Sequence, residues 1–399
     1  MTRNVTARSF KISTRSISNL ENLSSTLSIP LKTLQKTLVL PKPDRYRRDE
    51  LPKSDGGIRI IYNPSQMIRL VQRRINSRIL SNNQILAWPP FLFGSIPKSK
   101  DALGNEITRD YITCAAQHCG AKSLLKLDVK DFFDNVHADL VYGVFSQLLK
   151  FPHLVSASLT NICTFESHLI QGALTSSFLA NLCLHDVEAF VVDRLAKKNL
   201  TYTRFVDDIT ISSKTSKYDF SYALSIVEEM LTSKDLPLNR QKTKVYFSSS
   251  TPLTVHGLRI CFAEPRLPSD EVRRIRASVK NLETIANERS YRMTHAYRHD
   301  YNRCMGKVNK LARLKHNQHI PLLDRLRKIP PLPSKKDISR AIQIVSRLER
   351  DFFLKKNTYW YYRRFYIAYE RLNVLKISYP RMTKLLKIRL KKLKPIYEK

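Results

Sequence analysis

Residues 202–212 read YTRFVDDITIS, with two adjacent acids between runs of β-forming residues. Runs of alternating polar and apolar residues stand on both sides of Asp207 and Asp208, which predicts a β-hairpin with two carboxylates at its turn. Earlier in the chain, SLLKLDV at residues 123–129 predicts an apolar strand that carries an acid, Asp128, near its end. Neighbouring strands would gather the three acids at one end of a sheet.

Grouped carboxylates are what metal-assisted phosphoryl transfer requires. Divalent metals lower the charge cost at the attacking and leaving oxygens, and carboxylates hold the metals close together. Mg²⁺ prefers oxygen ligands and keeps several waters, so two or three Asp from adjacent strands suffice. The Asp pair alone does not establish catalysis, because Asp is also common in ordinary turns.

The rest of the chain predicts an α+β centre with an antiparallel sheet, followed by a helical region. Residues 51–65 read as two β-rich runs, with Asp55, Gly56 and Gly57 supplying the turn between them. Helical period recurs in residues 66–82, 138–150 and 176–198, and further strands are predicted at residues 200–206, 209–213, 244–248 and 254–261. After Pro268 the chain becomes mostly helical and highly basic, which marks the clearest domain boundary.

The charge of the chain points to a polyanionic partner. Of 399 residues, 69 are Lys or Arg and 34 are Asp or Glu, which gives a net charge of +35. Residues 271–399 hold 34 basic and 10 acidic residues, so this third of the chain supplies +24 of the +35. Nucleic acid is the predicted partner, because neutralised phosphates release counterions on binding. A ribosome-associated or membrane-associated basic protein is the alternative.

Cysteine usage and the N-terminus bear on location. The six cysteines include no Cys-x-x-Cys pair and no zinc-ligand spacing, which favours free thiols in a reducing cytosol. No stretch approaches the ~20 apolar residues of a membrane span. Residues 1–20 contain no acid and are rich in Arg and Ser, which is typical of a transit peptide and equally of a basic arm on nucleic acid. We favour the arm, given the charge of the rest of the chain.

Six motifs occur in one order along the chain. They are PKSDGGIRIIYNPS (52–65), LDVKDFF (127–133), QGALTSSFLANLCL (171–184), YTRFVDDITIS (202–212), LPLNRQKTKVYF (236–247) and VHGLRI (255–260). Together they resemble the reverse transcriptase family, specifically its retron-type branch, which includes retrons, related defence-associated enzymes and group II intron proteins. QGxxxSxxxxN followed by an F/Y-x-D-D turn between strands is highly specific as a set.

The resemblance implies an α+β fold of the right-hand polymerase type, with fingers, a palm built on an antiparallel sheet, and a helical thumb. The expected parts are a basic N-terminal leader at 1–50, fingers at 51–115, the catalytic palm at 116–262 and a helical basic thumb or RNA-binding region at 263–399. It also implies that Asp128, Asp207 and Asp208 are catalytic and bind two Mg²⁺ ions, with Mn²⁺ as an alternative.

Other motif positions are implied to bind the incoming nucleotide. Phe133 would sit under the sugar, where its ring leaves no room for a 2′-OH; core packing beside Phe132 is the alternative. Gln171 and Gly172 would approach the nucleotide and template, the glycine because its backbone can come close.

Three basic residues complete the implied nucleotide site. Lys53 and Arg59 resemble finger residues that grip the triphosphate, since a guanidinium fork matches phosphate oxygens. Lys242 resembles a lysine near the leaving pyrophosphate, where it could donate a proton. A single Lys in so basic a chain is often only a solvated charge, so that alternative stays open.

The chain departs from the family pattern at three places. Phe-Val at 205–206 stands where the family usually has Tyr-Ala, which keeps the ring and removes a hydroxyl. Cys-Ala-Ala-Gln-His at 114–118 and Val-His-Gly at 255–257 each differ by one change from the retron patterns Asn-Ala-x-x-His and Val-Thr-Gly. The resemblance therefore suggests that His118 and His256 contact a structured RNA, and leaves assignment as a true retron enzyme open.

Two C-terminal stretches are candidates for nucleic-acid contact. In NTYWYYRRFYIAYER (357–371) aromatics and arginines alternate, as expected where bases stack and phosphates are gripped, and Arg363 and Arg364 are its RNA-binding candidates. Core packing of the aromatics is the alternative. The terminal TKLLKIRLKKLK (383–394) predicts an amphipathic basic helix that binds phosphates, with an anionic membrane surface as the alternative.

The sequence thus predicts an RNA-directed DNA polymerase of the bacterial cytoplasm. It would copy a structured noncoding RNA template into a DNA product from dNTPs by two-metal phosphoryl transfer. The resemblance further implies a retron or antiphage defence role with an effector protein as a partner. Oligomeric state, cognate RNA and primer are not indicated by the sequence.

Three alternatives stay open at this point. The chain could be a maturase-like RNA-binding splicing cofactor in which catalysis is dispensable, although an intact acidic set argues against this. It could be a mobile-intron enzyme, although the Cys/His-rich endonuclease module of such proteins is missing from this sequence. It could also be a template-independent or protein-primed DNA polymerase.

Overall fold

A computed structural model describes residues 8–52, 56–100 and 103–397 of the chain. Internal contacts divide the chain into two compact units, each considered by itself: unit 1, Met1–Arg266, and unit 2, Leu267–Lys399. The division lies close to Pro268, where the sequence predicts the change to a basic helical region.

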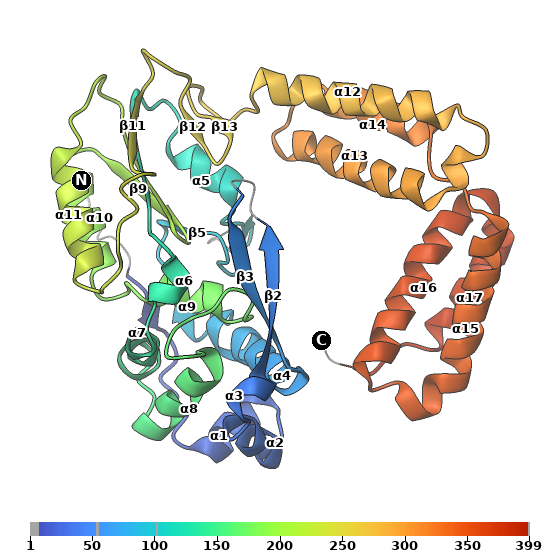
Figure 1. The fold of residues 1–399 in the computed structure, drawn as a ribbon, viewed down its shortest axis with the longest axis horizontal. Coiled ribbons are helices and arrows are strands. Elements are labelled where there is room, and N and C mark those ends of the chain that lie inside the picture. The colour runs from blue at the N-terminus through green and yellow to red at the C-terminus, as the bar shows by residue number, and fades with distance from the viewer. Residues whose placement is uncertain (1–7, 53–55, 101–102, 398–399) are drawn as a thin grey trace. The chain divides into compact units, whose positions relative to one another are not determined.

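The centre of unit 1 is a five-stranded sheet (Figure 1). Its strands, in the spatial order β11-β8-β10-β9-β5, are Lys244–Phe247, Ser123–Asp128, Asp208–Ser213, Thr201–Phe205 and Leu92–Phe93. All neighbours are antiparallel except β5 and β9, which are parallel. The predicted hairpin is confirmed, and β5 joins the sheet from a region that we assigned to the fingers.

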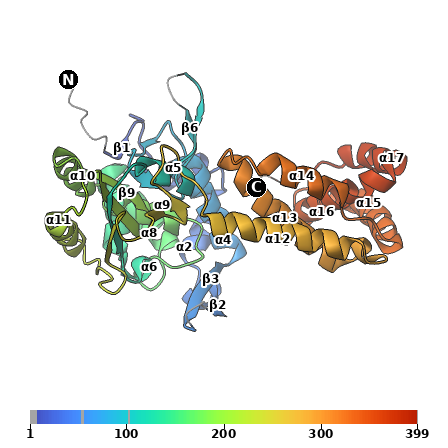
Figure 2. The same ribbon diagram turned by 90° about the horizontal axis from the view of Figure 1, so that it is seen from above.

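Helices cover both faces of this sheet, because successive side chains of a strand point to opposite faces. Arg204 of β9 points to the face covered by α10 (Glu188–Lys197), beside which lies α11 (Ser221–Thr232), as Figures 1 and 2 show. Thr203 points to the opposite face, toward the end of α5 (Tyr111–Gln117).

Two long paired strands lie at the start of the region expected to be the fingers. These strands are β2 (Tyr46–Pro52) and β3 (Ile58–Pro64), paired antiparallel. The two strands predicted within residues 51–65 are confirmed, with the first beginning earlier, while residues 53–55 of the predicted turn lie outside the described part. The backbone N–H of Tyr62 donates to the carbonyl of Gln171 at 2.7 Å, which ties the hairpin to a loop of the main body.

The expected leader is largely part of the folded unit. Helices α1 (Leu20–Leu27) and α2 (Leu31–Leu38) bury Leu23 and Leu34 completely in the main hydrophobic core. Each such burial contributes about 1.5–3 kcal/mol. The prediction of a separate basic leader at 1–50 is therefore corrected for this region, while the first seven residues lie outside the described part.

The helix expected at residues 176–198 is two helices, α9 (Ser176–Leu182) and α10 (Glu188–Lys197). The last carbonyls of a helix lack partners within it. Here the carbonyls of Ala180 and Asn181 accept hydrogen bonds from a buried arginine of β9. A tertiary contact thus satisfies the end of α9, and the sequence pattern does not reveal it.

Shorter elements complete unit 1. The strand predicted at 254–261 is instead a small hairpin, β12 and β13. The helices are α3 Lys42–Arg45, α4 Gln66–Ile75, α6 Phe132–Asn135, α7 Ala138–Gly143 and α8 His153–Cys163, with π-helical turns at Asn76–Leu80 and Val144–Leu148; the strands are β1 Phe10–Lys11, β4 Leu86–Ala87, β6 Ser99–Lys100, β7 Glu106–Ile107, β12 Thr254–Val255 and β13 Leu258–Arg259.

Unit 2 consists of two helical bundles rather than one (Figure 1). The first is built from α12 Ser269–Ala286, α13 His295–Arg313 and α14 His319–Lys328, with a 3₁₀ turn at Tyr291–Met293; the second is built from α15 Lys335–Lys355, α16 Tyr359–Ser378 and α17 Pro380–Lys391. A proline-rich segment joins them, and Ser334 with Asp337 forms a capping box at the start of α15. None of the described helices is long and apolar enough to cross a membrane.

Candidate active site

The predicted acidic residues meet at one end of the five-stranded sheet. Asp128, the last residue of β8, pairs directly with Asp208, the first residue of β10. Asp207 occupies the adjoining turn, and its carbonyl accepts a hydrogen bond from the Val129 N–H at 3.2 Å. Directly opposed residues of antiparallel strands have neighbouring Cβ atoms, so the register brings these carboxylates close together.

The site crowds negative charge. Loss of hydration raises the pKa of Asp207, and the Asp128 carboxylate raises it further. Loss of hydration also raises the pKa of Asp208 to about 6, with Asp207 and Asp128 adding to the shift. The charges of Lys242 and Arg59 act in the opposite direction on Asp207, so both basic residues lie close enough to influence the acidic turn.

Asp128 is held by two residues of the motif at 236–247. Lys242 contacts its carboxylate at 3.1 Å, and the Asn239 side-chain amide donates to it at 3.0 Å. The backbone N–H of Asn239 also donates to the Asp128 carbonyl at 2.8 Å. Lys242 is a predicted site residue, whereas Asn239 was missed; its place two residues after a proline in the LPLNRQK motif was the only signal.

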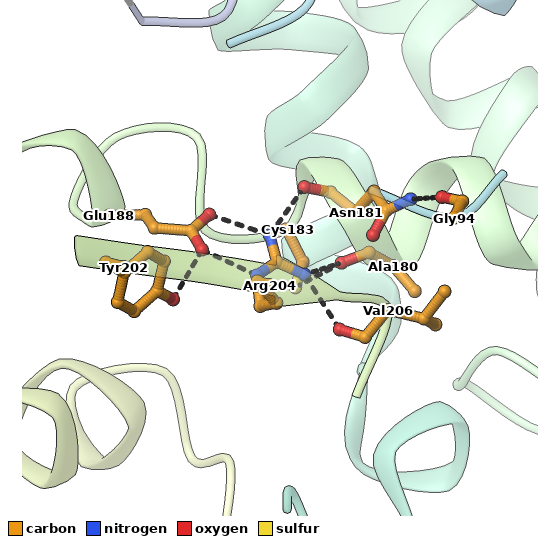
Figure 3. A network of polar contacts seen from close by, with 8 residues as sticks. All are labelled: Gly94, Ala180, Asn181, Cys183, Glu188, Tyr202, Arg204 and Val206. Atoms are coloured by element: carbon orange, nitrogen blue, oxygen red, sulfur yellow. Dashed lines mark hydrogen bonds and ion pairs between the residues drawn. The ribbon is translucent and has the colours of Figure 1, made fainter. Parts of the chain in front are cut away.

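The turn between the two sheet strands is conformationally strained. Val206 has φ of 60°, in the left-handed region that β-branched residues rarely adopt. Its carbonyl accepts a hydrogen bond from the Arg204 guanidinium at 3.1 Å, as Figure 3 shows. The surrounding structure therefore holds a conformation that the residue itself disfavours.

Arg204 is completely buried and anchors this turn (Figure 3). Its guanidinium makes two hydrogen bonds to the carboxylate of Glu188, at 2.6 and 2.7 Å, and that carboxylate also accepts from the Tyr202 hydroxyl at 2.7 Å. Removing one partner of a buried ion pair leaves an uncompensated charge, which costs about 3–5 kcal/mol. Sequence reasoning missed this network, although an Arg between apolar residues of a buried strand was a usable signal.

Phe205 is packed tightly beside the acidic turn. A Cβ added to Gly94 would lie 2.8 Å from the Phe205 ring, so the glycine permits this contact. On the same ring lies His256, with ring centroids 4.6 Å apart. The Asn181 side chain donates to the Gly94 carbonyl at 2.7 Å, which links this packing to α9 (Figure 3).

The two histidines expected to contact RNA have internal partners. His118 is 1% exposed, and its ring nitrogens lie 2.7 Å from the Ser212 hydroxyl and 2.8 Å from the Thr203 hydroxyl. Burial lowers the pKa of His118 to about 3. The prediction that His118 contacts RNA is therefore corrected: it is a neutral residue that joins α5 to the sheet.

His256 is partly buried, and its Nε2 lies 3.4 Å from the Cys114 thiol. Burial lowers the pKa of His256 to about 4. It supports the Phe205 ring, and its contact with RNA stays a prediction.

Gly172 closely approaches the backbone of β3. With φ of 108°, it lies so close to β3 that an added Cβ would be 2.3 Å from the Tyr62 carbonyl oxygen. Its glycine character is therefore required for docking of the hairpin. Contact of Gln171 and Gly172 with a nucleotide stays a prediction.

Three nucleotide candidates remain, namely Phe133, Arg59 and Lys53. Phe133 is partly buried, with its ring centroid 6.1 Å from that of the buried Phe132, so it packs on the core while keeping an exposed portion. Arg59 is exposed on β3. Lys53 lies outside the described residues.

The two arginine candidates of unit 2 differ in their surroundings. Arg363 is exposed, with its guanidinium 5.7 Å from the centre of the Trp360 ring, and that ring is 66% exposed. Arg364 forms an ion pair with Asp351 at 2.6 Å. The aromatic residues of this stretch differ in exposure: Trp360 faces solvent, whereas Tyr361 is buried in the core of the second bundle.

The donor set at the sheet end fits divalent metals in its chemistry. Carboxylate oxygens are the ligands that Mg²⁺ prefers, and a cation would relieve the repulsion that raises the pKa values of Asp207 and Asp208. Over the described ranges, no three His, Cys, Asp or Glu side chains already stand in the arrangement of a metal site. Lys242 instead provides the positive charge beside Asp128.

Comparison with known proteins identifies similar chains. The family profile described as Reverse transcriptase (RNA-dependent DNA polymerase) matches residues 51–260. Retron Ec48 reverse transcriptase from Escherichia coli is 45% identical over 383 residues, which cover 95% of this chain and 93% of that protein. Retron Se72 reverse transcriptase from Salmonella heidelberg is 30% identical over 330 residues, covering 81% and 83%.

Among solved structures, apo telomerase from Candida Tropicalis matches 96% of this chain and 77% of that chain. The TM-score is 0.42 at 11% identity, a likeness too distant to inform the fold.

Proposed function

The chain belongs to the reverse transcriptase family, and from this premise we propose that Asp128, Asp207 and Asp208 bind the divalent metal ions for DNA synthesis on an RNA template. The chain is a retron-type reverse transcriptase and therefore an RNA-directed DNA polymerase. The observation that carries the site assignment is the direct pairing of Asp128 with Asp208 beside the Asp207 turn.

The proposed reaction is attack of a primer hydroxyl on the α-phosphate of a dNTP, with release of pyrophosphate. When bound, two Mg²⁺ ions (or Mn²⁺) would stabilise charge at the attacking and leaving oxygens. Arg59 would grip the triphosphate, and Lys242 beside Asp128 would balance charge near the leaving group. Phe133 would exclude a 2′-OH and so select dNTPs. The binding of nucleotide by Lys53, Gln171 and Gly172 is part of the same proposal.

The template is proposed to be a structured noncoding RNA. The positive charge of residues 271–399, together with similarity to chains named retron reverse transcriptases, supports this proposal. Unit 2 would then act as the thumb and RNA-binding region. A role in antiphage defence with an effector protein extends the proposal through the retron resemblance, as does a location in the bacterial cytoplasm.

The test compares the parent with an Asp207→Asn/Asp208→Asn variant. We expect dNTP incorporation on a primed RNA template to fall by about 10³-fold or more, because several kcal/mol of charge stabilisation depend on these carboxylates. Asp235→Asn is the matched control, since Asp235 is an exposed acid of the same unit and has a positive φ that Asn tolerates. Incorporation at the parent rate by the double variant would overturn the site assignment.

Sequencing the nucleic acid that copurifies with the parent tests the template. A defined structured RNA joined to DNA is the expected result. Incorporation without any template, or DNA attached to a protein hydroxyl, would instead favour a template-independent or protein-primed enzyme. Bound RNA with no polymerisation by the parent would favour a maturase-like cofactor.

A further inference from the structure

The second bundle of unit 2 contains a hollow of about 240 Å³ between α15 and α16. Six residues line this hollow, which we term the arginine groove: Arg340, Gln343, Ile344, Arg347, Arg364 and Arg371. Four of the six are arginines and none is acidic, so the groove concentrates positive charge.

Helical spacing explains why these side chains converge. Arg340 and Arg347 are seven residues apart on α15, and Arg364 and Arg371 are seven apart on α16. Residues at this spacing share one helix face, because seven residues are close to two turns. The two helices pack against each other in one bundle, so two rows of guanidinium groups face the same hollow.

The bundle neutralises one of the four groove arginines with an ion pair and leaves the other three without one. Asp351 pairs with Arg364 at 2.6 Å and with Lys355 at 3.5 Å. Among the described residues, Arg340, Arg347 and Arg371 have no ion pair. Of the nearby acids, Glu349 pairs with Arg389 on α17 and Asp337 pairs with Arg298 on α13. Glu370 is exposed in an adjoining hollow that Arg340 and Arg371 also line, and it does not line the groove itself.

Three unpaired guanidinium groups in one hollow repel one another unless an anion binds. The planar guanidinium fork matches phosphate oxygens in pairs of hydrogen bonds, so phosphate is the anion that this geometry suits. A row of phosphates fits two rows of arginines better than a single small anion does.

Two further residues favour RNA over DNA. The Gln343 side chain can accept a hydrogen bond through its amide oxygen, and phosphates offer no donor, whereas the 2′-hydroxyl of RNA does. Close to the groove on α16, the exposed Trp360 ring lies against Arg363. Folded RNA presents unpaired bases that stack on such exposed aromatic rings.

We propose that the arginine groove of the second bundle binds the phosphate backbone of the RNA template. The inference rests on the proposed function, because it takes RNA as the partner, and it adds the surface that holds this RNA. The groove contributes to RNA affinity and takes no part in phosphoryl transfer.

The test compares two full-length variants that lose the same charge. The groove variant carries Arg340→Gln, Arg347→Gln and Arg371→Gln. The control variant carries Arg350→Gln, Lys376→Gln and Arg381→Gln, three exposed residues of the same bundle that lie outside both the groove and the basic stretch 383–394. Binding of an RNA hairpin with an unpaired loop is measured over a range of salt concentrations, and thermal unfolding verifies that each variant is folded.

The parent is expected to bind the RNA hairpin more tightly than a DNA hairpin of the same sequence. For the groove variant, the slope of log affinity against log salt should fall by about 2–3, since each lost phosphate contact removes about 0.9. At moderate salt its Kd should rise by about tenfold or more. The control variant should change the slope by less than about 1. A Gln343→Ala variant should lose part of the preference for RNA.

Equal losses in both variants would show that diffuse charge, rather than this groove, binds RNA. Equal affinity of the parent for both hairpins, or displacement of RNA by inorganic phosphate at millimolar concentration, would also overturn the proposal. These binding results do not depend on polymerisation. Failure of the parent to extend a primer would therefore count against the proposed function and not against the groove.

Discussion

At the scale of single residues, the buried ion pair of Arg204 and Glu188 supports the turn that carries Asp207. Arg204 joins the Val206 carbonyl to the carboxylate of Glu188, and Val206 is held at a positive φ. The conformation of the acidic turn therefore depends on a charge that never reaches solvent. The effects of Arg204 on stability and on activity can be measured separately. Apolar side chains can replace its ion pair with Glu188, but they cannot donate a hydrogen bond to the Val206 carbonyl.

Arg204→Met should destabilise unit 1 by about 3–5 kcal/mol, because Glu188 is left buried without its partner. The triple variant Arg204→Met, Glu188→Leu and Tyr202→Phe should recover part of that loss, because no polar group of the trio is left unpaired, although the carbonyls of Ala180, Asn181 and Val206 lose their donor. Its dNTP incorporation should stay low, since nothing then holds the Val206 carbonyl. Denaturant unfolding and primer extension measure the two effects. Parent-like incorporation by the triple variant would show that Arg204 does not position the turn.

Phe133→Ala should admit ribonucleotides, because removing the ring opens room for a 2′-OH. We expect the preference for dNTP over rNTP to fall by about 10- to 200-fold, the range for a lost steric contact in a pocket. Competitive incorporation on a primed RNA template measures the ratio. Phe132→Ala is the control: its ring is buried, so it should cost about 3–5 kcal/mol of stability without changing sugar selection. An unchanged ratio in Phe133→Ala would place that ring in the core alone.

At the scale of elements, two contacts join separate parts of unit 1. Gly172 allows the hairpin of β2 and β3 to approach the main body within van der Waals distance. His118 joins α5 to β9 and β10 through two hydroxyl groups. Both contacts help to position elements that carry the proposed site residues.

Gly172→Ala should displace the hairpin, because its Cβ would lie 2.3 Å from the Tyr62 carbonyl oxygen. Arg59 is carried on β3, so the KM for dNTP should rise while kcat changes less. Gly120→Ala is the matched control, since Gly120 also has a positive φ but a Cβ there meets nothing within 4 Å. In both variants the free energy of unfolding should fall by about 1–2 kcal/mol, because alanine disfavours a positive φ. Steady-state kinetics with equal KM values in the two variants would contradict the docking role.

His118 should make stability sensitive to acid. Its pKa is about 3 in the folded chain against 6.5 for an ordinary histidine, so the unfolded state binds more protons between these values. Stability should therefore rise with pH across this window, and fall by about 1.4 kcal/mol for each pH unit below about 6.5. His118→Gln should show a shallower slope between pH 6.5 and 5 in denaturant unfolding. Parallel curves for parent and variant would contradict a neutral His118.

At the scale of the whole molecule, the chain combines two units with separate cores. Leu34 belongs to the main core of unit 1, and Leu348 belongs to the core of the second bundle in unit 2. Unit 1 carries the acidic turn, whereas unit 2 carries most of the excess charge. The proposed catalytic acids and most of the excess positive charge therefore belong to different units of the chain.

Calorimetry of the full chain should show more than one transition. Leu34→Ala should lower the midpoint temperature of one transition and Leu348→Ala that of another. Each substitution should reduce the free energy of unfolding of its own unit by about 2–5 kcal/mol, since both side chains are fully buried. A single transition that both substitutions shift equally would mean that the units unfold together.

Features that depend on local patterns could be predicted from the amino-acid sequence. Alternating side chains around Asp207 and Asp208 specify a hairpin, and its register follows from the short turn. The same reasoning identifies the fingers hairpin and the helical region after Pro268. These predictions were confirmed because neighbouring residues alone decide turn chemistry and amphipathic period.

Only the tertiary structure decided the contacts between distant segments. His118 lies 94 residues before Ser212 and 85 before Thr203, so no local pattern marked it as a buried link rather than an RNA contact. The N-terminal helices, predicted as a leader, were found in the core for the same reason. Arg204 and the arginine groove likewise depend on which helix faces meet. A side chain's partners are set by packing of the whole unit, and the free energy of that packing is not encoded in any single stretch of sequence.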